Sequence, residues 1–174
     1  MTPTNRPVTS EAPEAHFSYI NRVPEGDISR ILETQLDEAA ALFGAISEKD
    51  SLYRYAPDKW SIRQVLSHIN DCERLFTFRA FWFARGFDSP LPGFEQEVAA
   101  AGAAADRRSL QSHVGEFRFL RMATISLVHS LGSEGWDRRG VAGGSPMTVR
   151  ALIFMAAGHV IHHIGILEER YRRQ

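Results

Sequence analysis

The sequence contains one cysteine, almost no net charge and no uncharged apolar run long enough to cross a bilayer. Cys72 has no second cysteine to pair with, so an internal disulfide is excluded and a cytoplasmic protein is expected. The 20 Lys and Arg residues nearly cancel the 21 Asp and Glu residues, which argues against a nucleic-acid partner. The longest uncharged apolar stretch, between Arg150 and Glu168, is shorter than the roughly 20 residues of a membrane-spanning helix, so no membrane partner is expected. The N-terminal residues also lack the apolar segment of a signal peptide.

Signals for β-strands are scarce as well, because apolar and polar residues never alternate over more than four positions. The apolar content, 44% of 174 residues, is sufficient for one full-sized hydrophobic core. Residues 1–23 are rich in Pro, Thr and Glu, and we expect them to form an N-terminal arm. Residues 24–174 are expected to form a single all-α domain.

Four segments carry apolar residues at helical spacing. Asp27 is the expected N-cap of the first, and Thr148 is the expected N-cap of the last. Ser61 and Gln64 fit a capping box at the start of the second helix, and Gly86 is suited to the position just after its end. The expected helices cover residues 28–46, 62–85, 110–131 and 149–171.

The connection between the second and third expected helices, residues 87–106, is too long for a tight turn, since such connections usually take about 2–8 residues. We expect it to cross an end of the molecule or pack along its side, and to hold a short helix. Four long amphipathic helices with this connection predict a four-helix bundle whose order is not simply up-down-up-down.

Three of the seven histidines lie in the stretch GHVIHHIGILEERY. His159 and His163 are one helical turn apart and project from one face, where two imidazoles can hold one divalent ion. His162 lies about 100° further around the helix and is expected at the edge of the buried face or at a subunit contact. A packed helix with hydrogen-bonded ring nitrogens is the alternative. The histidines outside the second and fourth helices are expected in the arm or on the surface: His16, His113 and His129.

His68 lies on the second expected helix, in an apolar stripe that also contains Cys72. Inward-facing histidines on two helices can complete a three-histidine site, which with an open fourth position favours zinc or nickel. A hydrogen-bonded core histidine is the alternative for His68. Cys72 is expected to be a small buried apolar residue, and its alternative role is a fourth ligand that closes a structural zinc site.

Two strings in the sequence resemble signatures of the DinB-like (DinB/YfiT) superfamily. The string YRYAPDKWSIRQVLSHINDCERLF resembles the first signature, and VRALIFMAAGHVIHHIGILEERY is similar to the closing one, G-H-x-x-H-H before Glu-Arg-Tyr. The similarity extends over residues 17–171. It implies an up-down-down-up four-helix bundle, a homodimer and a divalent metal site formed by His68, His159 and His163, with His162 outside the ligand set.

The resemblance also implies a metal-dependent enzyme with a small-molecule substrate. Relatives include thiol S-transferases that use low-molecular-weight thiols, a mycothiol-dependent maleylpyruvate isomerase, and proteins regarded as hydrolases. A transferase would hold a thiol cosubstrate as its thiolate, whereas a hydrolase would use metal-bound hydroxide. The non-catalytic alternative is a metal-stabilised or metal-sensing dimer. The candidates for binding the carboxylate of an acidic thiol are Arg79, Arg118 and Arg121, and those for a general base are Asp71 and Glu73.

Overall fold

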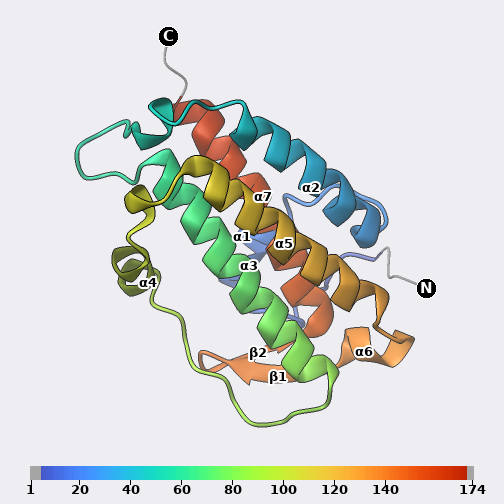
Figure 1. The fold of residues 1–174 in the computed structure, drawn as a ribbon. Coiled ribbons are helices and arrows are strands. Elements are labelled where there is room, and N and C mark those ends of the chain that lie inside the picture. The colour runs from blue at the N-terminus through green and yellow to red at the C-terminus, as the bar shows by residue number, and fades with distance from the viewer. Residues whose placement is uncertain (1–4, 172–174) are drawn as a thin grey trace.

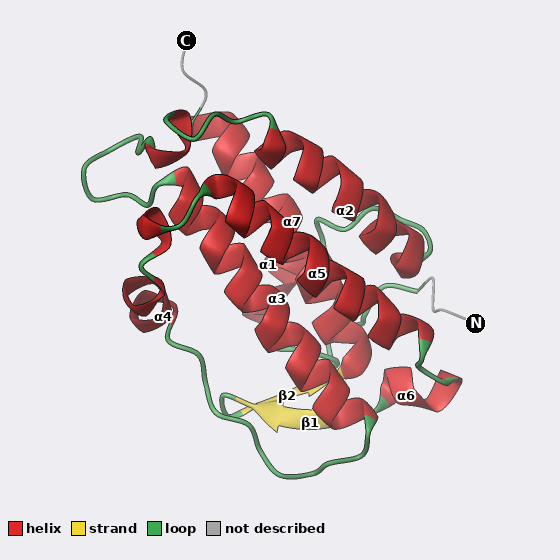
Figure 2. Ribbon diagram, viewed as in Figure 1, coloured by secondary structure: helices red, strands yellow, loops and turns green. Residues whose placement is uncertain are grey.

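Four long helices make up most of the computed structural model, which describes residues 5–171 (Figures 1 and 2). The long helices are α2 (Ile28–Gly44), α3 (Ile62–Ala84), α5 (Leu110–His129) and α7 (Val149–Arg170). Three short helices lie between or before them: α1 (Phe17–Ile20), α4 (Gln96–Ala103) and α6 (Ser133–Asp137). Single 3-10 turns cover Glu14–His16, Asp50–Leu52 and Ala105–Arg107.

The starts of three of the four long helices, α2, α3 and α7, are fixed by the capping residues that the sequence predicts. The Asp27 side chain accepts a hydrogen bond from the backbone N–H of Ser29, and Thr148 does the same for Ala151. At α3, Ser61 and the Gln64 side chain form both bonds of the capping box. The helix ends just before Gly86, whose φ of 85° is accessible to glycine at little cost. These predictions are confirmed.

Helix α7 is the most deeply buried of the long helices and packs against α1 and α3. It is the one helix in residues 5–171 that is long and apolar enough to span a membrane, but 61% of its most apolar window is buried inside the protein. A core helix of a bundle has this composition because all of its faces meet other apolar side chains.

A two-stranded antiparallel sheet corrects the prediction of an all-α domain. Strands β1 (Arg139–Ala142) and β2 (Ser145–Thr148) are joined by Gly143 and Gly144, which both have positive φ. Two consecutive glycines of this kind suit the tight turns that connect β-hairpins. Strands of four residues are too short to give a recognisable alternation in the sequence, which is why the prediction missed them.

The chain between α3 and α5 includes α4, the short helix expected there, and runs past the hairpin (Figure 1). The backbone of Leu91 exchanges hydrogen bonds with Val141 and Gly143, so this segment is fixed to β1 and its turn. On the other side of the molecule, α1 packs against α7 and buries Ile20. Residues 1–4 of the expected arm lie outside the described residues, and the domain boundary at residue 24 stays a prediction.

Candidate metal centre

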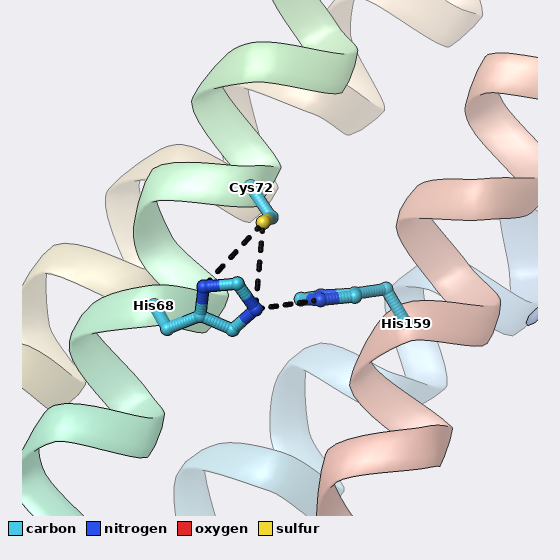
Figure 3. Close-up of side chains that lie close together, drawn as sticks. All are labelled: His68, Cys72 and His159. Carbon is cyan, nitrogen blue, oxygen red and sulfur yellow. Dashed lines mark hydrogen bonds between the residues drawn. The ribbon is translucent and has the colours of Figure 1, made fainter. Parts of the chain in front are cut away.

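Three histidine side chains from two helices meet in the interior. The Nε2 atom of His159 on α7 lies 3.1 Å from the Nε2 atom of His68 on α3 and 3.0 Å from the Nε2 atom of His163. His68 and His159 point towards each other across the gap between their helices (Figure 3). The structure therefore brings together all three residues that the sequence and the family resemblance select as metal ligands.

Aromatic rings enclose this cluster. The Trp60 ring lies 4.9 Å from the His68 ring, between ring centroids, and the corresponding distances from His159 are 5.3 Å to Tyr19 and 5.8 Å to Phe76. Helix α1 supplies Tyr19 and comes close to α7 because Gly158 has no side chain at the point of contact. Both His68 and His159 are buried as a result.

The enclosure keeps the histidines neutral. Burial lowers the pKa of His68 to about 4 and that of His163 to about 3, and it lowers the pKa of His159 well below its ordinary value of 6.5. The neutral imidazole is the form that binds a metal ion. The three rings thus present unprotonated nitrogens at neutral pH.

The donor set fits a divalent ion. One proton at most can lie between two ring nitrogens, so three converging Nε2 atoms leave lone pairs that face one another. A cation removes this repulsion. Nitrogen ligands about 2.0–2.1 Å from a tetrahedral zinc ion lie roughly 3.3 Å apart. The observed separations of 3.0 Å and 3.1 Å are close to that spacing.

Cys72 is buried as expected, but it also lies at the cluster. Its Sγ atom is 3.7 Å from Nε2 of His68, and donor atoms of Cys72, His68 and His159 all lie within 4.8 Å of one another (Figure 3). Burial raises the pKa of the thiol to about 12, so without a metal it stays protonated. Cys72 is therefore more than apolar filling, because its sulfur is placed to serve as a fourth donor.

The remaining histidines differ in their surroundings. His162 is half-buried beside Tyr19, at the edge of the buried face as predicted, and in residues 5–171 no hydrogen bond joins it to the cluster. His129 is exposed as predicted. His113 is fully buried with Nε2 3.0 Å from the carbonyl oxygen of Ala105, so its prediction as a surface residue is wrong.

The two candidate bases lie away from the histidines. Asp71 forms an ion pair with Arg74 at 3.5 Å, and no contact in the described part of the chain joins it to the cluster. Glu73 is buried in an ion pair with Arg121, whose Nη2 donates to Oε2 at 2.9 Å. Arg121 is fully buried there, so it is neither a surface charge nor free to bind a ligand.

A pocket of about 450 Å³ opens beside the cluster. Of the three candidate arginines, only Arg79 lines it, whereas Arg118 lies in a separate groove between α2 and α5. Sequence reasoning missed His16, Gly93 and the hairpin as parts of its wall, because the residues that line it come from distant segments. The lining residues besides the metal-site residues include His16, Tyr19, Phe76, Arg79, Gly93, Phe94, Glu95, Ala142, Gly143 and Met147.

The sequence model of the DinB superfamily matches residues 31–167. The chain belongs to the DinB superfamily. A search of curated proteins by sequence gave no match for this DinB-superfamily protein.

Three similar solved structures share its fold. YfiT from Bacillus subtilis, a probable metal-dependent hydrolase with an unusual four-helix bundle topology, is 15% identical with a TM-score of 0.69, over 95% of this chain and 90% of that one. The mycothiol-dependent maleylpyruvate isomerase is 9% identical with a TM-score of 0.67, over 83% of this chain and 61% of that one. The DinB-like protein YjoA from Bacillus subtilis is 23% identical with a TM-score of 0.60, over 84% of this chain and 90% of that one.

Proposed function

We propose that this protein is a metal-dependent enzyme in which His68, His159 and His163 hold one zinc or nickel ion. The observation that carries the proposal is the convergence of three neutral imidazoles, with Nε2 separations of 3.0 Å and 3.1 Å, beside a pocket of about 450 Å³. A pocket of this size suits a small-molecule substrate. An ion held by three histidines keeps a position open for such a ligand.

The reaction that we propose is transfer of a low-molecular-weight thiol to an electrophile. A bound divalent ion holds a thiol as its thiolate at neutral pH, which is the reactive form. The aromatic rings of Trp60, Tyr19 and Phe76 pack around the cluster, and Arg79 provides a positive charge in the pocket. The fold shared with the mycothiol-dependent isomerase is consistent with thiol chemistry.

Hydrolysis is the second candidate, and the fold shared with YfiT favours it. A hydrolase benefits from a carboxylate that takes a proton from metal-bound water. Glu73 is committed to Arg121, and Asp71 is paired with Arg74. Within the described residues these contacts leave neither candidate base at the cluster, which is why we place thiol transfer first.

The position of Cys72 favours a third candidate, a structural metal site in a metal-stabilised or metal-sensing dimer. If the sulfur is a fourth ligand, the ion has no open position. Removing the metal is then expected to unfold the protein.

Metal content, measured by plasma mass spectrometry on untagged protein, separates the two enzyme candidates from the structural site. The comparison uses wild type, His159→Ala and Cys72→Ala, with helical circular dichroism recorded for each. The enzyme proposal expects about one equivalent of metal in wild type and in Cys72→Ala, and loss of metal from a folded His159→Ala. Loss of metal and fold in both variants would support the structural site. Absence of metal from wild type after reconstitution with zinc or nickel would exclude all metal-dependent candidates.

We further propose an up-down-down-up bundle, a homodimer and a cytoplasmic location. The N-terminal ends of α3 and α5 are joined, because Ser61 donates to Asp106 and Arg63, in the first turn of α3, donates to the carbonyl oxygen of Arg108. Both helices therefore begin at the same end of the bundle, which supports the down-down step of this order. Exposed apolar side chains on the same helices, including Phe78 and Phe119, support the dimer. Light scattering coupled to gel filtration tests it.

A further inference from the structure

Among residues 5–171, Arg79 is the one permanent cation that lines the pocket beside the three histidines. His68, Cys72 and Arg79 lie on one face of α3, because intervals of four and seven residues bring a helix back to nearly the same direction. The Cα atoms of His68 and Arg79 are about 16 Å apart along the axis. Arg79, His68 and His159 line the same pocket, so one ligand in it can contact both the guanidinium and the metal cluster.

The guanidinium is largely desolvated but only partly satisfied. Arg79 is 6% exposed, and Nη2 donates one hydrogen bond, at 2.8 Å, to the carbonyl oxygen of Pro92. Nε and Nη1 have no hydrogen-bond partner among residues 5–171, and both nitrogens keep some exposure to solvent. No carboxylate in this range forms an ion pair with Arg79. A buried cation of this kind is costly unless an anion completes its contacts.

The other titratable groups that line the pocket indicate which kind of anion can bind beside Arg79. Within the described part of the chain, Glu95 is the only acidic side chain that lines it. Burial and the nearby Arg79 charge lower the pKa of His16, so this histidine is neutral at pH 7. One fixed positive charge beside one negative charge favours a monoanion over a phosphate dianion. The planar guanidinium edge matches a carboxylate.

We propose that Arg79 binds the carboxylate of an acidic, peptide-sized ligand whose reacting atom lies at the three histidines. The assignment rests on the proposed function, since it names the substrate class of the same pocket. The helical spacing of about 16 Å between His68 and Arg79 is too long for a two-carbon acid to contact both the cluster and the guanidinium. A cysteine-containing dipeptide acid can extend from one to the other.

Two probes that differ only in the charge of their C-terminal group test whether Arg79 binds a carboxylate. N-acetyl-Cys-Gly and its C-terminal amide are titrated into zinc-loaded protein, and binding is followed by nuclear magnetic resonance. Wild type is expected to bind the acid about tenfold more tightly than the amide, and Arg79→Gln is expected to bind the two equally. Arg85→Gln, at the exposed C-cap arginine that follows the same helix, is the control and should keep the wild-type preference. Equal binding of acid and amide by wild type, including no binding of either, overturns the assignment, as does a preference that survives in Arg79→Gln.

If loss of the hydrogen bond to Pro92 unfolds Arg79→Gln, a second variant tests the assignment of Arg79. Glu95 is exposed, and its side chain makes no capping hydrogen bond to α4. Removing its charge in Glu95→Gln is expected to tighten binding of the acid about threefold and to leave binding of the amide unchanged. If Glu95→Gln binds the acid no more tightly than wild type does, the result contradicts the assignment of Arg79 as the group that binds the carboxylate.

S-methylated versions of the two probes separate this inference from the proposed function. They cannot offer a thiolate to the ion, so they report on Arg79 alone. A preference for the S-methylated acid over its amide supports the assignment even if the thiol adds nothing to affinity. If free thiol and S-methylated acids bind alike, thiol transfer fails while the carboxylate site stands.

Discussion

The Nε2 atoms of His68 and His159 lie 3.1 Å apart, although 91 positions separate the two residues in the sequence. The contact joins α3 to α7, so the cluster exists only when these helices are packed together. An ion that binds the folded chain and not the unfolded one therefore stabilises the packing of this pair, to an extent set by its concentration and affinity.

Adjacent histidines on α7 provide a matched test of the ligand set. His163 has Nε2 3.0 Å from Nε2 of His159, whereas His162 has no hydrogen bond to the cluster in the described part of the chain. We expect His163→Ala to weaken zinc binding by more than about 100-fold and His162→Ala to change it little. Competition with a chromogenic chelator measures both affinities. A change in His163→Ala as small as that expected for His162→Ala would exclude His163 from the ligand set.

Two glycines on α7 test how α1 is held over the cluster. A Cβ atom on Gly158 would lie 2.1 Å from the carbonyl oxygen of Tyr19, whereas one on Gly165 would meet nothing within 4 Å. We expect Gly158→Ala to lower the free energy of unfolding by about 1–3 kcal/mol, because α1 must move away. Gly165→Ala is expected to raise it by up to about 1 kcal/mol through better helix propensity. Urea denaturation of both variants checks the difference, and similar changes in both would contradict the close contact.

The helix starts were predictable because capping is local. Asp27, Ser61 and Thr148 each bond to a backbone N–H two or three residues further along the chain, so the pattern is complete within a short window. The hairpin was not predictable in the same way. Its strands have only four residues, and its contact with Leu91 depends on a distant part of the chain.

Part of the metal site was predictable because it also depends on a local sequence pattern. His159 and His163 lie one turn apart on one helix, so their pairing follows from helical periodicity. The approach of His68 from another helix needed the family resemblance. The prediction of Arg121 as a ligand-binding or surface residue is wrong, because its side chain is fully buried. Its partner Glu73 is 48 positions away, and a sequence does not show that a charge will be neutralised in the interior.

Acid sensitivity is expected where Glu48 meets the start of α5. The backbone N–H groups of Leu110 and Gln111 donate to its carboxylate, and these bonds, together with the Arg63 charge, hold the pKa of Glu48 below its ordinary 4.5. A folded-state pKa below the unfolded value gives stability that is fully present above pH 4.5 and is lost as the pH falls through the folded-state pKa. Wild type should therefore lose more of its Tm on acidification than Glu48→Gln does.

Thermal melts between pH 3 and pH 7 measure the effect. Glu38→Gln is the control, because Glu38 is exposed on α2 and its side chain makes no hydrogen bond or ion pair in residues 5–171. It should follow the wild-type pH dependence. The same pH dependence in Glu48→Gln as in wild type would show that these bonds do not stabilise α5.

The buried pair of Glu73 and Arg121 is expected to be strongly coupled. The Nε atom of Arg121 lies 2.9 Å from Oε1 of Glu73, a close ionic contact without hydrogen-bond geometry, and Nη2 donates to Oε2 at 2.9 Å. Gln35 and Thr124 complete the surroundings with bonds to the guanidinium and the carboxylate. Removing one member leaves the other charge uncompensated in the core.

Glu73→Leu and Arg121→Met are therefore each expected to lower the free energy of unfolding by about 3–5 kcal/mol. The double variant should lose less than the sum of the two, because it leaves no unpaired charge and fills the same space with apolar atoms. Urea denaturation of the four proteins gives the coupling free energy directly. A coupling near zero would mean that each residue acts through its own separate contacts, with Gln35 on one side and Thr124 on the other, and that the ion pair itself contributes little.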